Sequence, residues 1–160
     1  MRLEMRLSLA QEMIESAFEE HGLGAKGWTF SWDRARLRFG ACWPKRKRIS
    51  LSRVLTELND TDHVRDTILH EIAHALVFER YGYLRGHGPE WQALALQLGA
   101  TPQARTTSGK LPKGRFELVH RSTGEVYRTF QRRPKNSDLG GRYIQGRKAE
   151  TLDQLIIVEL

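Results

Sequence analysis

The sequence contains very little cysteine: Cys42 is the only one among 160 residues. A single thiol cannot form a disulfide within the chain, which excludes the small secreted modules that disulfides hold together. A chain of this length can instead bury a hydrophobic core, as one domain or as a core domain with a small appendage. We therefore expect a cytoplasmic protein.

The sequence also lacks long apolar runs. No stretch reaches the roughly 18 apolar residues that a membrane-spanning helix requires. The first residues carry charges at short intervals and contain no apolar core of about 7 to 15 residues, the mark of a signal peptide. These absences predict a soluble protein with no membrane partner.

Acidic residues are fewer than basic ones: 19 Asp and Glu stand against 26 Lys and Arg, for a net charge of +7. The excess is uneven, because residues 101–160 hold 12 basic and 6 acidic side chains, whereas residues 61–100 hold 3 and 5. A basic surface favours polyanions such as nucleic acid through counterion release, although a modest excess is also an ordinary route to solubility.

The N-terminal part predicts one helix followed by three strands. From Leu7 to Phe18, apolar residues recur at three- and four-residue spacing, as in an amphipathic helix. Residues 28–52 contain three segments in which apolar and polar side chains alternate, and we expect three short antiparallel strands with one face buried. Trp28 and Trp32 fall on one face of the first strand, which favours a place in the core.

A longer helix is predicted between residues 60 and 82. Asp60 or Thr61 can cap its start, and Gly82 can end it. This helix carries an apolar stripe and a histidine-bearing stripe, roughly 100° or more apart at 3.6 residues per turn. We therefore expect one side to face the core and the other a cleft. A second, shorter helix is predicted to begin near Pro89 and to end at Gly99.

Residues 101–114 are polar and rich in glycine, proline and threonine, so we place a boundary there. Four segments beyond it resemble strands: residues 115–120, 125–130, 141–146 and 152–160. The chain as a whole predicts an α+β fold. A core domain of residues 1–104 would be followed by a small, basic, β-rich C-terminal subdomain of residues 105–160.

His70, Glu71 and His74 form a His-Glu-x-x-His pattern inside the longer helix. The spacing puts both imidazoles on one helix face, about 6 Å apart along the axis, which suits two ligands of one metal ion. On a helix this is the pattern of zinc metallohydrolases, with the glutamate as general base. Chance alone would produce it in roughly one or two of every hundred chains. The alternative is a pair of core histidines beside a surface carboxylate.

A catalytic zinc site takes three protein ligands and leaves one position for water, so a third ligand is required. His87 is the expected one, because flanking glycines allow close backbone approach and the following helix would hold the loop. Glu90 is the alternative, since another zincin arrangement uses a downstream glutamate. Arg80 excludes the shorter metzincin spacing, which needs histidine there. We place His63 outside the metal site, as a supporting or surface residue.

If the site forms, zinc lowers the pKa of its water towards roughly 7 and polarises a carbonyl group. Glu71 can then take a proton and pass it to the leaving amine. The predicted reaction is peptide bond hydrolysis, with Zn²⁺ as the cofactor and a protein as the substrate.

The segments FGACWPKRKRISLS, ILHEIAHAL and GHGPEW occur in this order between roughly residues 5 and 100. Together they resemble the SprT-like metalloproteases, the family that includes the Spartan proteases. The resemblance implies a zincin-like core, in which a small antiparallel sheet packs with the active-site helix. It also implies that His70, His74 and His87 bind zinc and that Glu71 is the catalytic base. Spartan-like members are DNA-dependent proteases that degrade proteins trapped on DNA, which implies a DNA-associated substrate.

The C-terminal part departs from that resemblance. SprT-like proteins often carry a C-terminal zinc ribbon with paired cysteines, and residues 101–160 contain none. Any DNA preference that such a ribbon supplies is therefore in doubt. We expect apolar side chains to organise a similar hairpin arrangement in place of a metal: Phe116, Leu118, Tyr127, Phe130, Tyr143, Leu155 and Ile157.

Two basic clusters are candidates for nucleic-acid binding. The first combines Trp43 with Lys45, Arg46, Lys47 and Arg48, and the second contains Arg132, Arg133 and Lys135. Single-stranded or distorted DNA is bound by cationic side chains together with a stacking aromatic ring. The alternative for each cluster is a solvated charged face.

Three functions are compatible with these patterns. The first is a zinc-dependent endopeptidase, stimulated by DNA, that cleaves DNA-bound or DNA-crosslinked proteins. The second is a zinc metallopeptidase for other cytosolic proteins, with a basic surface that only keeps it soluble. The third is a non-catalytic nucleic-acid-binding module with structural zinc. An intact Glu71 disfavours the third, because a structural site has no use for that carboxylate and usually has four protein ligands.

Overall fold

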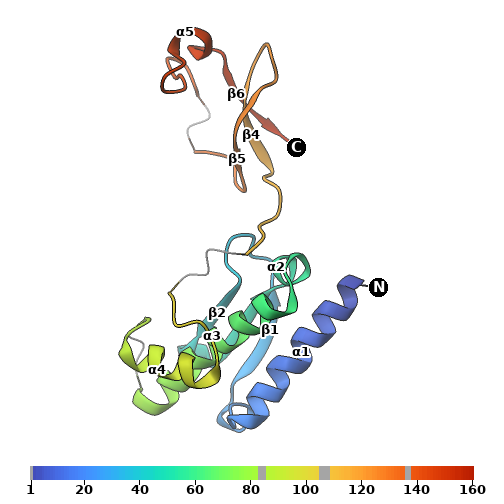
Figure 1. Ribbon diagram of the computed structural model, residues 1–160, viewed down its shortest axis with the longest axis vertical. Helices are drawn as coiled ribbons and strands as arrows, with labels where there is room; N and C mark the ends of the chain where they lie inside the picture. Colours follow the sequence, from blue (N-terminus) through green and yellow to red (C-terminus); the bar gives the residue numbers. More distant parts are fainter. Residues whose placement is uncertain (1, 83–85, 105–108, 136–137) are drawn as a thin grey trace. The chain divides into compact units, whose positions relative to one another are not determined.

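The computed structural model describes residues 2–82, 86–104, 109–135 and 138–160 (Figure 1). The chain divides into two compact units, residues 1–112 and 113–160. The predicted boundary between residues 104 and 105 adjoins a stretch, 105–108, that lies outside the described residues. None of the helices in the described ranges is both long and apolar enough to cross a membrane.

The secondary structure is mixed, which confirms the α+β class. The first unit contains α1 (Arg2–Glu20), η1 (Gly24–Lys26), β1 (Thr29–Asp33), β2 (Gly40–Trp43), η2 (Pro44–Arg46), β3 (Arg48–Ser52), α2 (Arg53–Leu58), α3 (Thr61–Tyr81) and α4 (Pro89–Leu98). The second unit contains β4 (Phe116–His120), β5 (Val126–Phe130), α5 (Lys148–Thr151) and β6 (Leu155–Glu159).

The sheet of the first unit is mixed, so the prediction of three antiparallel strands is wrong. Its strand order is β1-β3-β2, with β3 antiparallel to β2 but parallel to β1. Alternation of apolar side chains shows which residues share a face, but it is the same for either strand direction. The connection from Asp33 to Gly40 takes the chain to the far side of β3, and this route decides the direction.

The helices cover this sheet with one continuous core. Figure 1 shows α3 lying across the strands, with α1 and α4 beside it. Ile14 of α1, Ile49 of β3 and Ile72 of α3 are all completely buried in the same cluster. Trp28 is also in this core, at 3% exposed, and Trp32 packs against it, as their alternation predicts. The apolar stripe of α3 therefore lies in the core, where Ile68 is 1% exposed and Ile72 is completely buried.

A short helix, α2, follows β3 directly and was not predicted. Ser52, the last residue of β3, is its N-cap: the backbone N–H of Leu55 donates to the Ser52 hydroxyl oxygen at 3.1 Å. A serine three residues before the N–H group that it caps is a recognisable signal for the start of a helix. The helix α2 is too short, however, for its sequence to show helical periodicity.

The second unit is a three-stranded antiparallel sheet of order β5-β4-β6. The strands expected over residues 115–120, 125–130 and 152–160 are present. The strand expected over 141–146 is wrong, because these residues form turns and extended coil. Isolated apolar residues there pack locally: Tyr143 is 48% exposed and lies under the Lys148 ammonium group.

Polar side chains contribute to the centre of this cysteine-free unit. Of the seven apolar residues expected to organise it, Phe116 and Leu155 are buried. Val119, which is not one of the seven, is buried as well. His120, 9% exposed, has its Nε2 2.9 Å from the Glu150 carbonyl oxygen. The Thr151 hydroxyl is completely buried and donates to the Arg147 carbonyl oxygen. Hydrogen bonds therefore tie α5 to the sheet.

Candidate metal centre and active-site cleft

The helix α3 presents His70, Glu71 and His74 at its centre. The Asp60 side chain caps the helix by accepting from the backbone N–H of His63 at 2.9 Å, as its sequence position predicts. The helix ends at Gly82, which has a left-handed φ of 72°. With both ends set, the four-residue spacing brings the two imidazoles to the same face of the helix.

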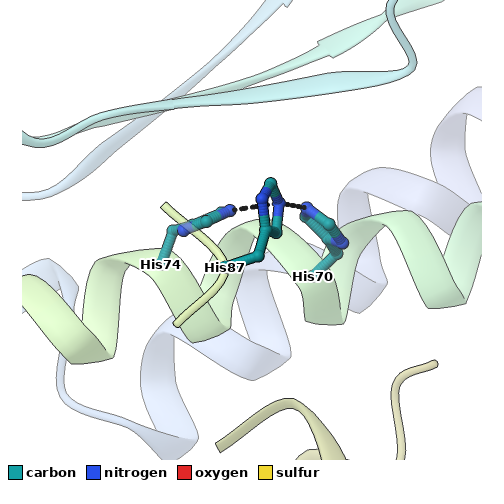
Figure 2. A group of neighbouring side chains, drawn as sticks. All are labelled: His70, His74 and His87. Carbon is teal, nitrogen blue, oxygen red and sulfur yellow. Dashed lines mark hydrogen bonds between the residues drawn. The ribbon is translucent and has the colours of Figure 1, made fainter. Parts of the chain in front are cut away.

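His87 comes from a separate segment and meets the other two rings from above α3 (Figure 2). It immediately precedes α4, which starts with Pro89 at its first turn. The Gln92 side chain, one turn into α4, donates to the His87 carbonyl oxygen at 3.1 Å. This bond anchors the backbone of the loop to the helix that follows it.

The three imidazoles converge through their Nε2 atoms. The Nε2 of His87 lies 3.0 Å from that of His70 and 3.2 Å from that of His74. One ligand atom from each residue falls within 4.8 Å of the others. Nitrogens about 2.0–2.1 Å from a tetrahedral metal ion would stand roughly 3.3 Å apart. The three histidines could therefore hold one metal ion, and Glu90 is not part of this group.

Burial keeps the two helix histidines in the neutral form. Burial, and then the charge of neighbouring His87, lower the pKa of His70 to about 4. Burial is also the main cause that lowers the pKa of His74 to about 3, followed by His70 and His87. Burial lowers the pKa of His87 as well. A neutral imidazole is the form that binds a metal, so the lowered pKa values of these histidines reduce the competition between a proton and a metal ion.

Trp91 lies under all three imidazoles, a role that the sequence analysis missed. Its ring centroid is 4.6 Å from His70 and from His87, and it stacks on His74 at 5.3 Å. Its indole N–H donates to the His70 carbonyl oxygen at 3.3 Å. Trp91 is 1% exposed and belongs to the core of the first unit. The three histidines of the candidate metal centre thus pack against a buried aromatic ring.

Trp91→Ala is expected to destabilise the metal-free protein by roughly 3–5 kcal/mol, the usual cost of deleting a buried large aromatic side chain. Denaturant unfolding measures this loss. Trp43→Ala, which truncates an indole that is 38% exposed, is the matched control and should cost less than about 1 kcal/mol. Equal losses at the two positions would contradict a supporting role for Trp91.

Glu71 lies between the two helix histidines in sequence and is buried, at 7% exposed. Burial raises the pKa of Glu71 to about 8, against the lowering effects of the Arg38 charge and of the Cys42 backbone N–H, which hydrogen-bonds to the carboxylate. Arg38 is itself held by Asp33, with 2.8 Å between guanidinium nitrogen and carboxylate oxygen. A strongly perturbed carboxyl group in a cleft is a common property of catalytic acids and bases.

These side chains line an open cleft of about 650 Å³. One wall comes from the start of β2 and the residues before it, and the floor from α3. The lining residues are Leu37, Arg38, Phe39, Gly40, Ala41, Cys42, Thr67, His70, Glu71, His74, Gly86, His87 and Ala104. Arg38, Gly40 and Cys42 contact the candidate site although the sequence pattern did not identify them.

The sequence profile of the SprT-like family matches residues 7–110, which include the whole cleft. This chain belongs to the SprT-like family. Its relatives include the protein SprT of Pectobacterium carotovorum, 31% identical over 49% of this chain and 46% of the relative. The protein SprT of Klebsiella pneumoniae strain 342 is 32% identical over 49% of this chain and 43% of the relative. The chain thus spans less than half the length of these relatives, and no solved structure is significantly similar to it.

In this SprT-like protein, the first basic cluster lies at the turn between β2 and β3. Lys45 and Arg46 are exposed. Trp43 is half-exposed and has the Arg38 and Arg48 guanidinium groups 5.5 and 5.7 Å from its ring centroid. These side chains combine a flat aromatic ring with positive charge.

Lys47 has a different role from its neighbours. Its ammonium group donates to the Lys26 carbonyl oxygen at 2.8 Å and lies 3.1 Å from the Glu79 carboxylate. Its backbone adopts a left-handed φ of 45°, and its carbonyl accepts from the Thr29 N–H. Glu79 also accepts from the Trp28 indole. Lys47 therefore ties the β2–β3 turn to β1 and α3.

The second basic cluster lies in the second unit, just after β5. Arg132, Arg133 and Lys135 are exposed there. Arg133 shares a pocket of its own unit with two carboxylates, Asp138 and Asp153. Arg121 lines the same pocket, so this part of the second unit carries charges of both signs.

Proposed function

We propose that this protein is a zinc-dependent endopeptidase. The observation that carries the proposal is the convergence of three neutral histidines beside a buried carboxylate in an open cleft. Only three ligands gather in the described part of the chain, which suits a catalytic site with a position left for water better than a closed structural one. The protein ligands of the proposed ion are His70, His74 and His87.

Zinc is the metal that best suits this set of ligands. Three imidazoles are a common ligand set of catalytic zinc sites. When bound, the ion would acidify water and polarise a carbonyl group. Glu71 would accept a proton from the attacking water and deliver it to the nitrogen of the leaving amine. Arg38 and the Cys42 N–H would hold the carboxylate in place and partly offset the rise that burial causes in its pKa.

An extended segment of protein suits this cleft as the substrate. β2 is an edge strand, paired with β3 alone in the described part of the sheet, and its residues line the cleft wall. An edge strand offers unpaired backbone groups to an extended polypeptide and recognises it with little dependence on side chains. The proposal is an endopeptidase of loose sequence preference that acts in the cytoplasm.

We further propose that DNA stimulates the enzyme and that its substrates are DNA-bound or DNA-crosslinked proteins. Two features support this. Exposed Lys45 and Arg46 stand beside the half-exposed Trp43, the combination that binds single-stranded DNA. Arg38 lines the cleft and lies against the same indole, so the basic cluster continues directly into the cleft wall.

The expected result is faster degradation of a DNA-binding protein when single-stranded DNA is added. The Lys45→Ala/Arg46→Ala double variant should weaken DNA binding and lower the slope of log affinity against log salt by about 1 to 1.5, because each phosphate contact contributes about 0.7. Fluorescence anisotropy at several salt concentrations measures both quantities.

Lys47→Ala is the matched control, because its ammonium group is already paired within the protein. It should leave the salt slope unchanged and cost about 1 kcal/mol or less in stability. Degradation that does not respond to DNA, with no affinity at low salt, would favour a peptidase for other cytosolic proteins. DNA binding without any peptidase activity would favour the non-catalytic module.

A further inference from the structure

β2 approaches α3 closely at Gly40. A Cβ atom at this position would lie 2.8 Å from the Glu71 Cγ, 2.9 Å from its Oε1 and 3.1 Å from the Thr67 Cγ2. Contacts under 3.0 Å are not tolerated by carbon atoms, so any side chain here would occupy space that Glu71 now fills. The backbone of Gly40 is not in the left-handed region, so glycine is needed for space rather than for its φ.

The Glu71 side chain is also held from a second point of the same strand. The Cys42 backbone N–H, two residues beyond Gly40, hydrogen-bonds to the carboxylate. Gly40 and Cys42 pair with Leu51 and Ile49 of β3, both buried, so the strand is fixed from its other side. We call the Gly40 backbone and the Cys42 N–H the carboxylate seat.

We propose that Gly40 is the positioning residue for Glu71, and that its missing side chain lets the carboxylate occupy the seat. This proposal rests on the proposed function. The added methyl group of Gly40→Ala would clash with two atoms of the Glu71 side chain, which can rotate away. The strand β2 cannot move instead, because it is paired with β3. The carboxylate therefore leaves the seat while the sheet and the helix stay in place.

Gly40→Ala should lower kcat by about 100-fold, because displacing a catalytic group by about 1 Å has an effect of that size. KM and metal content should not change, since none of the three atoms nearest to an added Cβ at Gly40 belongs to a histidine. Gly24→Ala is the matched control: Gly24 has no atoms within 4 Å of an added Cβ and an ordinary φ, so its kcat should equal that of the wild type.

A second measurement does not depend on activity. The thermal midpoint of the metal-free protein is compared for Gly40→Ala, Glu71→Ala and the double variant. Removing the Glu71 side chain beyond Cβ deletes the two closest of the three atoms nearest to the new methyl group and leaves the Thr67 Cγ2, at 3.1 Å. The shift in midpoint caused by Gly40→Ala should therefore be at least halved in the Glu71→Ala background.

The possible results separate the two proposals. Equal midpoint shifts in both backgrounds, or failure to fold in both, would overturn the positioning role. Glycine would then be required at position 40 by the packing of the strand itself and not by Glu71. An unchanged kcat in Gly40→Ala would overturn it as well. A wild-type protein without peptidase activity but with the expected coupling of midpoints would overturn the proposed function and leave the packing of Glu71 on Gly40 established.

Discussion

Glu71→Gln is expected to lower kcat by about 1,000-fold while zinc stays bound. Glutamine has almost the same shape and can still accept a hydrogen bond from the Cys42 N–H, but it cannot accept a proton from water. General acid–base groups commonly contribute rate factors of about 100 to 10,000. Steady-state cleavage of an unfolded protein substrate measures the loss, and elemental analysis of the same preparation measures the metal.

Glu12→Gln is a suitable control for this variant, because Glu12 is exposed on α1, far along the chain from the cleft residues. It should match the wild type in both measurements. If Glu71→Gln retains turnover, Glu71 is not the proton acceptor. If it loses zinc as well as turnover, the carboxylate serves the metal site instead of the chemistry.

His87→Ala is expected to weaken zinc binding by more than about 100-fold. Loss of a group that merely orients a ligand already costs roughly 10- to 100-fold in metal affinity, and loss of a ligand should cost more. His70 and His74 would remain on α3, but two imidazoles alone make a weak site. Competition with a chromogenic chelator measures the affinity, and peptidase activity should fall in parallel.

Glu90→Gln tests the alternative third ligand. The structure places His87 with the other two histidines and Glu90 outside the group, so this variant should keep the wild-type affinity for zinc. The opposite pattern, with zinc lost in Glu90→Gln and kept in His87→Ala, would reassign the third ligand to Glu90.

Local patterns in the sequence were sufficient for the three longest helices, α1, α3 and α4. The caps of α3 at Asp60 and Gly82 lie where capping chemistry predicted them. The relation between His70 and His74 follows from helix geometry alone, because four residues make about one turn. Interactions between residues close in sequence depend on a backbone geometry that is known in advance, so they can be derived without a structure.

Strand pairing and the C-terminal unit were predicted less well. The parallel pairing of β1 with β3 depends on the route of a connecting loop, and alternation does not report that route. In the second unit, the strand expected over residues 141–146 is wrong. The buried hydrogen bonds of His120 and Thr151, which no periodicity reveals, help to order that region.

By itself, the sequence determined the α+β class, the helix that carries His70 and His74, and the resemblance to the family to which the chain belongs. Only the tertiary structure decided that His87 reaches those two rings, that Trp91 lies beneath them, and that Gly40 leaves room for Glu71. These contacts join segments that are distant along the chain. Their distances depend on how the sheet, α3 and α4 pack together, and packing is a property of the whole fold rather than of any one segment.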